Sequence, residues 1–125
     1  MEKKYLDLHD IHVYTLATEI SDEIYSIVSS WDWFQKRTLG AQFIDAVDSI
    51  AGNIAEGFGR FHKKDKEKFY YIARGSVLES IHWLERAEKR KLIDKDECQI
   101  LENKFKILPK ELNILIRITE EKLRK

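Results

Sequence analysis

The chain has 125 residues, which is enough for one core without metal or disulfide staples, since a chain of this length buries roughly two-thirds of its unfolded surface. Lysine and arginine number 22, as do aspartate and glutamate, so the excess of positive charge typical of strong non-specific nucleic-acid binders is absent. Cys98 is the only cysteine, which excludes an intramolecular disulfide. Residues 1–7 lack the apolar core of a signal peptide, and no apolar run approaches the roughly 20 residues that span a bilayer. We therefore expect a soluble cytoplasmic protein without a membrane partner.

Apolar residues recur at helical spacing and predict an all-α fold. The first helix is expected from about residue 10 to 30 and the second from about 38 to 57. The third begins near Lys64 or Asp65, and the fourth begins near Asp94, a suitable N-cap. Four amphipathic helices with short connections favour an antiparallel up-down-up-down bundle, with residues 1–125 forming a single domain.

Several local features follow from the same pattern. We expect a loop from Trp31 to Arg37, rich in aromatic and charged residues. In the third helix, Phe69, Ile72 and Trp83 are expected to share the core face with small residues. Pro109 removes one backbone donor inside the fourth helix, so we expect a bend near residues 105–109, or else a break into two helices.

The fourth helix carries more apolar surface than a monomeric bundle needs. Its core row is followed about 100 to 120° away by a second, isoleucine row. On the third helix, Tyr71 and Leu78 lie on the side opposite Phe69. One broad core could bury both rows, but a surplus on two helices favours a partner surface, and a second copy is the simplest partner. The core row is Leu101, Phe105, Leu108, Leu112 and Leu115; the predicted interface residues are Tyr71, Leu78, Ile100, Ile107, Ile114 and Ile118.

A polar stripe lies beside the apolar face of the second helix. Gln42, Ser49, Asn53 and Glu56 project into an arc of about 60°, a position typical of partial burial with satisfied hydrogen bonds. We expect a structural network in which these residues link the second helix to the third or to a neighbouring subunit. Its predicted members are Gln42, Ser49, Asn53, Glu56, Ser76 and Glu79.

The exact amino-acid sequences of two segments indicate a protein family more specifically than their helical periodicity does. Residues 53–60 read Asn-Ile-Ala-Glu-Gly-Phe-Gly-Arg, and residues 72–79 read Ile-Ala-Arg-Gly-Ser-Val-Leu-Glu. The chain thereby resembles, over nearly its whole length, the four-helix-bundle family of proteins encoded by intervening sequences in bacterial 23S ribosomal RNA genes. The residues on the family's signature positions are Asn53, Glu56, Gly57, Gly59, Arg60, Gly75, Ser76 and Glu79.

This resemblance implies an antiparallel four-helix protomer that assembles as a five-membered ring, and it implies no reaction. The family is related in fold to the accessory variability determinant of diversity-generating retroelements, which is associated with nucleic acid and a reverse transcriptase. Members often carry basic residues just after the glutamine of the second helix, where this chain has Asp45 and Asp48. Two functions remain open: a nucleic-acid or ribonucleoprotein accessory, and a scaffold that binds another protein.

A run of charge at the start of the third helix is the candidate for phosphate contacts. Residues 60–68 hold five cations and two anions, and Lys89 to Lys91 and the C-terminal Lys122, Arg124 and Lys125 add further positive charge. A solvated helix start of mixed charge is the alternative explanation. The predicted phosphate-contacting residues are Arg60, Lys63, Lys64, Lys66 and Lys68.

No set of residues predicts catalysis or a cofactor. Glu79 and His82 have the Glu-x-x-His spacing of di-iron bundles, but such sites need two copies and two further glutamates, so we expect no metal there. Cys98 is expected to be a buried thiol on the core side of the fourth helix. Gly52 to Gly59 lacks the ending and the preceding strand of a phosphate-binding loop. We therefore expect a protein that is not an enzyme.

Overall fold

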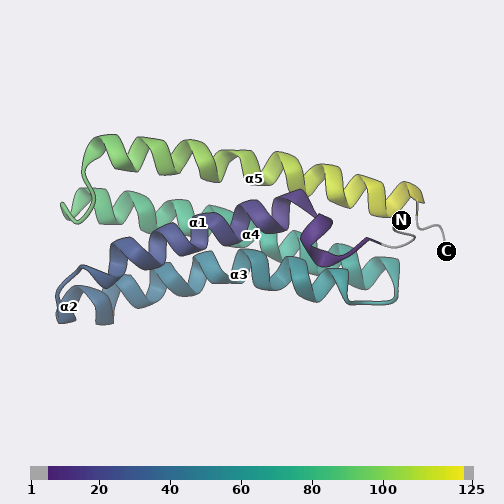
Figure 1. Cartoon of the computed structure of the whole chain (residues 1–125), viewed down its shortest axis with the longest axis horizontal. Helices are drawn as coiled ribbons and strands as arrows, with labels where there is room; N and C mark the ends of the chain where they lie inside the picture. The colour runs from purple at the N-terminus through teal and green to yellow at the C-terminus, as the bar shows by residue number, and fades with distance from the viewer. Residues whose placement is uncertain (1–5, 123–125) are drawn as a thin grey trace.

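A computed structural model describes residues 6–122 of the chain, without the side chain of Lys122. Four long helices run through this part of the chain: α1 (His12–Ser29), α3 (Ala41–Phe58), α4 (Lys63–Lys89) and α5 (Lys95–Lys122). They lie alongside one another and alternate in direction, so that α1 begins and α5 ends at the same end of the bundle (Figure 1). The predicted all-α fold with four helices is confirmed, and the described residues contain no strand.

The neighbours of each helix define the sides of the bundle. α3 packs on α1 and α4, while α5 packs on α4 and, less extensively, on α1. One apolar core fills the centre, with Phe43 of α3 and Phe105 of α5 among its largest fully buried side chains. No helix within residues 6–122 is both long and apolar enough to cross a lipid bilayer.

The predicted loop from Trp31 to Arg37 is largely helical, so this prediction is wrong. Asp32 caps a short helix, α2 (Trp33–Gln35), by accepting a hydrogen bond of 2.9 Å from the backbone N–H of Gln35. A π-helical turn, Lys36–Gly40, then leads directly into α3. Asp32 followed by Gln35 is the spacing of a capping box, and this was the signal in the sequence that a helix begins there.

The core face of α4 contains the predicted small residues, Ala73, Ser76 and Ser80, which are buried, but not the large residues expected beside them. Ile72 is exposed, and Phe69 and Trp83 are only partly buried, whereas Tyr70 and Val77 are buried in the core. The reason is that Ala73, Ser76 and Ser80 are small enough for α3 to approach α4 closely, which buries the next row of the helix instead.

α5 continues through Pro109, so a break into two helices does not occur. Phe105, Leu108 and Leu112, which flank the proline, are all fully buried against the other helices. A proline removes a single backbone hydrogen bond, and this packing holds both halves of the helix in place. The bend near residues 105–109 stays a prediction.

Candidate functional site

The isoleucine row of α5 lies on the outside of the protomer. Ile100, Ile107, Ile114 and Ile118 are 56%, 44%, 48% and 46% exposed, while the core row of the same helix is buried from Leu101 to Leu112 and partly buried at Leu115. The structure therefore does not bury both rows in one broad core. A straight row of exposed isoleucines is unusual on a helix that has already buried another apolar face.

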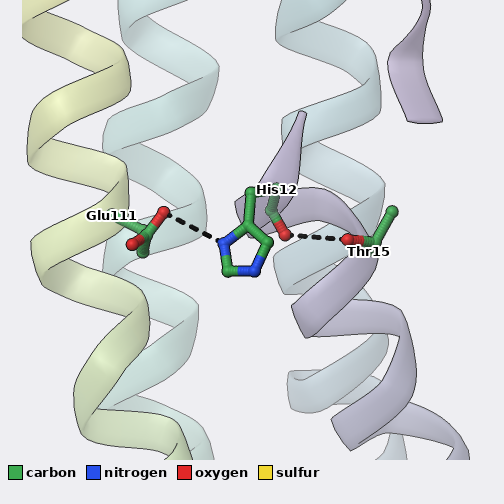
Figure 2. Close-up of polar contacts among 3 residues, drawn as sticks. All are labelled: His12, Thr15 and Glu111. Carbon is green, nitrogen blue, oxygen red and sulfur yellow. Dashed lines mark hydrogen bonds and ion pairs between the residues drawn. The ribbon is translucent and has the colours of Figure 1, made fainter. Parts of the chain in front are cut away.

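Polar contacts to α1 border the isoleucine row on its inner side. The Lys104 ammonium donates to the Glu23 carboxylate at 2.7 Å. The Glu111 carboxylate lies 3.3 Å from Nδ1 of His12, and the backbone carbonyl of His12 accepts a hydrogen bond from the Thr15 hydroxyl (Figure 2). These contacts lie at the seam between α1 and α5, so the isoleucines flank that seam.

The predicted interface residues of α4 lie on another side of the bundle. Tyr71 and Leu78 are 46% and 67% exposed. They lie beside Arg74, whose guanidinium is 4.8 Å from the Tyr71 ring and donates a hydrogen bond of 2.5 Å to the Asn113 side chain of α5. This pair therefore borders the seam between α4 and α5, and the two apolar patches lie on opposite flanks of α5.

The polar stripe of α3 bonds mainly along its own helix. The Ser49 hydroxyl donates to the carbonyl of Asp45 at 2.8 Å, and the Asn53 amide donates to the carbonyl of Ser49 at 2.7 Å. Gln42 is exposed, and both Ser49 and Asn53 are partly buried. Side chains that bond four residues back compete with the helix rather than joining it to a neighbour.

Glu56 and Glu79 also bond to residues four positions along the chain, whereas Ser76 takes part through its backbone carbonyl. The Glu56 carboxylate forms an ion pair of 2.7 Å with Arg60, four residues on. Glu79 accepts a hydrogen bond of 3.3 Å from the indole N–H of Trp83, and the buried Ser76 accepts one through its carbonyl from the Ser80 hydroxyl. Across the described residues, these six side chains make no hydrogen bond between α3 and α4. A link to a neighbouring subunit stays a prediction.

Most of the predicted phosphate-contacting cations have partners within the protomer. Lys63 donates to the carbonyl of Glu120, and Lys66 donates at 2.8 Å to the carbonyl of Phe58. Arg60 pairs with Glu56 and lies over the Phe69 ring, where Lys68 is also found, 5.9 Å from the ring centroid. Burial lowers the pKa of Lys66. Arg60 and Lys66 therefore stabilise the turn between α3 and α4, and Lys63 contacts α5, so these three cations already have partners when no ligand is bound.

A shallow pocket remains at the beginning of α4. Its lining residues, His62, Lys63, Lys64 and Asp65, enclose about 470 Å³. The backbone N–H groups of a first helical turn attract anions, and two lysines reinforce that field while Asp65 opposes it. The C-terminal cations Arg124 and Lys125, and the side chain of Lys122, lie outside the described residues.

The remaining candidates for a reactive site are the thiol of Cys98 and clusters of metal-ligating side chains. Cys98 is buried, as predicted, and its thiol pKa is raised by burial and by the nearby carboxylates of Glu88, Glu102 and Glu85. A thiol with a raised pKa is a poor nucleophile. Within residues 6–122, no group of three or more histidine, cysteine, aspartate or glutamate side chains could hold a metal ion.

Three surface features were missed in the sequence. Trp33 and Phe34 are 70% and 61% exposed at the end of the bundle where α2 lies, and Arg37 stacks on the Trp33 ring. Beside them, a groove of about 270 Å³ runs between α1 and α3, past Tyr25 and Lys36. The third feature is Gly75, in the middle of α4, which has no atom within 4 Å of the position that a Cβ would occupy.

Comparisons with known proteins agree on the fold. The model of the 23S rRNA-intervening sequence protein family matches residues 9–114. The chain is also similar to a crystal structure of a protein of unknown function from the S23 ribosomal protein family of Bacteroides thetaiotaomicron, with a TM-score of 0.74 and 20% sequence identity. That similarity covers 83% of this chain and 97% of the other. A search of curated proteins found no match.

Proposed function

Because the chain belongs to the 23S rRNA-intervening sequence protein family, we propose that it is a non-enzymatic scaffold that works as a ring-like homo-oligomer, a pentamer. The observation that supports this proposal best is the exposed isoleucine row of α5, together with Tyr71 and Leu78 of α4. Burying a fully exposed isoleucine contributes roughly 1.5 to 3 kcal/mol, and these four are about half-exposed, so covering each of them contributes roughly half of that. Association of copies supplies this stabilisation.

The placement of the two patches supports a ring more than a two-fold dimer. A two-fold interface uses the same patch on both subunits, whereas a ring or filament needs two different patches on each subunit. The protomer carries two, on opposite flanks of α5. The scaffold would act by presenting the same surfaces several times, which multiplies weak contacts to a partner.

Sedimentation equilibrium of the whole chain tests this proposal. We expect a mass five times the protomer's 14.9 kDa at micromolar concentration. Ile107→Lys should release protomers, whereas Gln99→Lys, an exposed position about 60 to 100° from the row around the same helix, should leave the assembly intact. A wild-type mass of one protomer would refute self-association, and a dimer or tetramer would refute the pentamer alone.

A second candidate function is a nucleic-acid or ribonucleoprotein accessory. It is supported by the pocket of His62, Lys63 and Lys64 at the start of α4, which a ring would repeat. It is weakened by Asp45 and by the internal partners of Arg60 and Lys66. We propose any such binding to be modest and tolerant of sequence. The cytoplasmic location expected from the sequence stays a prediction.

A further inference from the structure

Gly75 of α4 has no explanation within its own protomer. It lies in the middle of a 27-residue helix, it is exposed, and its φ is in the ordinary helical range. A Cβ at this position would meet nothing within 4 Å. Glycine in a helix interior is less stable than alanine by roughly 0.5 to 1 kcal/mol, so a glycine without a packing reason needs another cause.

The neighbours of Gly75 form an apolar row with a gap in it. Tyr71 precedes it by four residues and Leu78 follows by three, so the three positions lie on one line along the outside of α4. Tyr71 and Leu78 project into solvent on either side of the glycine. The space above Gly75, between Tyr71 and Leu78, is therefore a hole that a bulky side chain from another helix could enter.

The isoleucine row of α5 has matching dimensions. Ile107 and Ile114 are seven residues apart, as are Tyr71 and Leu78, so both pairs span two turns, about 10 Å of helix. The charges beside the rows are complementary at the Leu78 end of the α4 row, whereas Lys68 and Arg74 are cations at its Tyr71 end. Lys110 lies between the two isoleucines and Arg117 follows them, while Glu79 and Glu85 are exposed at the Leu78 end of the α4 row.

We infer that the two rows are the two halves of one interface, in which Ile107 and Ile114 of one copy pack against Tyr71 and Leu78 of the next, with Gly75 at the closest approach of the helices. This inference rests on the proposed self-association and specifies which surfaces meet. Because the rows lie on opposite flanks of α5, the two rows of one protomer cannot contact each other. The contact is therefore head-to-tail, and it closes as a ring when the rotation between copies allows.

Gly52 of α3 offers a matched control. It too is exposed, lies within a long helix, and has nothing within 4 Å of a Cβ position. Leucine at either position has open space around it in the protomer, so both variants should fold and melt at or above the wild-type temperature when dilute. Only Gly75→Leu should weaken association, by at least about fivefold in Kd, because the closely packed helices cannot accommodate the larger side chain without moving apart.

Each outcome of this comparison has a distinct meaning. If the wild type is a monomer, the proposed self-association fails and the inference fails with it. If the wild type assembles and Gly75→Leu assembles as tightly as Gly52→Leu, only the inference fails. A folded Gly75→Leu that dissociates while Gly52→Leu remains assembled supports it, and thermal melting of each dilute variant excludes misfolding as the cause.

Cysteine cross-linking distinguishes head-to-tail from two-fold contact. Gly75→Cys and Ile107→Cys are made as separate proteins, and Cys98 is left in place because it is buried. Under oxidation, the mixture should form disulfide-linked pairs, and each variant alone should not. Cross-linking of Gly75→Cys to itself, or of Ile107→Cys to itself, would indicate a two-fold interface and overturn the inference, as would the absence of linked pairs in a mixture that has assembled.

Discussion

Gly57 of α3 lies directly against the ring of Tyr70 in α4. A Cβ at Gly57 would come within 2.7 Å of the Tyr70 Cε1 atom and 3.0 Å of the backbone carbonyl of Lys66. Neither a buried ring nor a backbone carbonyl can move away at low cost. This contact brings α3 and α4 together where the chain turns between them. Gly57 differs in this respect from Gly52 and Gly75, where a Cβ would meet no other atom within 4 Å.

Alanine at Gly57 and at Gly52 should therefore act in opposite directions. We expect Gly57→Ala to lower the free energy of unfolding by about 1 to 3 kcal/mol through overpacking. Gly52→Ala should raise it by up to about 1 kcal/mol, because alanine is the better helix former and meets nothing there. Urea unfolding monitored by circular dichroism measures both, and a stabilised Gly57→Ala would contradict the packing described here.

Tyr70 should make the fold sensitive to alkali. Burial raises its pKa from 10.0 to about 12, so the folded state holds the phenolic proton more tightly than the unfolded state does. The stability that this proton contributes is complete below about pH 10 and is lost as the pH rises through about 12, by at most about 3 kcal/mol.

The pH dependence is measured as the difference in unfolding free energy between the wild type and Tyr70→Phe from pH 9 to 12. This comparison removes the contribution of Lys66, whose lowered pKa acts in the opposite direction by adding stability as the pH rises towards its unfolded value. A difference that stays constant over this range would show that Tyr70 ionises as readily in the folded state as in the unfolded state.

Asn53→Ala distinguishes a local from an intersubunit role for the polar stripe. Within the protomer, Asn53 bonds only to the Ser49 carbonyl of its own helix. Its removal should therefore change the unfolding free energy of the dilute protomer by less than about 0.5 kcal/mol, since alanine is the better helix former. A weakened assembly, measured by sedimentation of the same variant, would place Asn53 at a subunit contact, and an unchanged assembly would refute the network.

Binding to nucleic acid, if it occurs through the start of α4, should depend steeply on salt. The logarithm of the affinity should fall with the logarithm of salt concentration by about 0.7 to 0.9 per neutralised phosphate, and Lys63→Glu with Lys64→Glu should flatten that slope. Lys36→Glu with Lys106→Glu, two exposed cations away from the start of α4 and from the isoleucine row, is the control for net charge. Absence of binding to structured RNA or DNA at about 50 mM salt would favour the protein scaffold.

The sequence by itself determined the four helices and the separation of the isoleucine row from the core row of the fourth helix. A helix repeats every 3.6 residues, so positions 100, 107 and 114 lie on one side whatever packs nearby, and Leu101, Phe105 and Leu108 lie on another. The burial of Cys98 followed from the same periodicity.

Only the tertiary structure decided which flank of α4 is covered, because Ala73, Ser76 and Ser80 let α3 approach closely enough to bury Tyr70 and leave Ile72 outside. The tertiary structure likewise decided the surroundings of three helical glycines that the sequence does not distinguish: Gly57 packs on Tyr70, while Gly52 and Gly75 face open space. Periodicity is a property of a single helix, whereas close approach depends on residues distant in the chain, so local pattern alone cannot predict it.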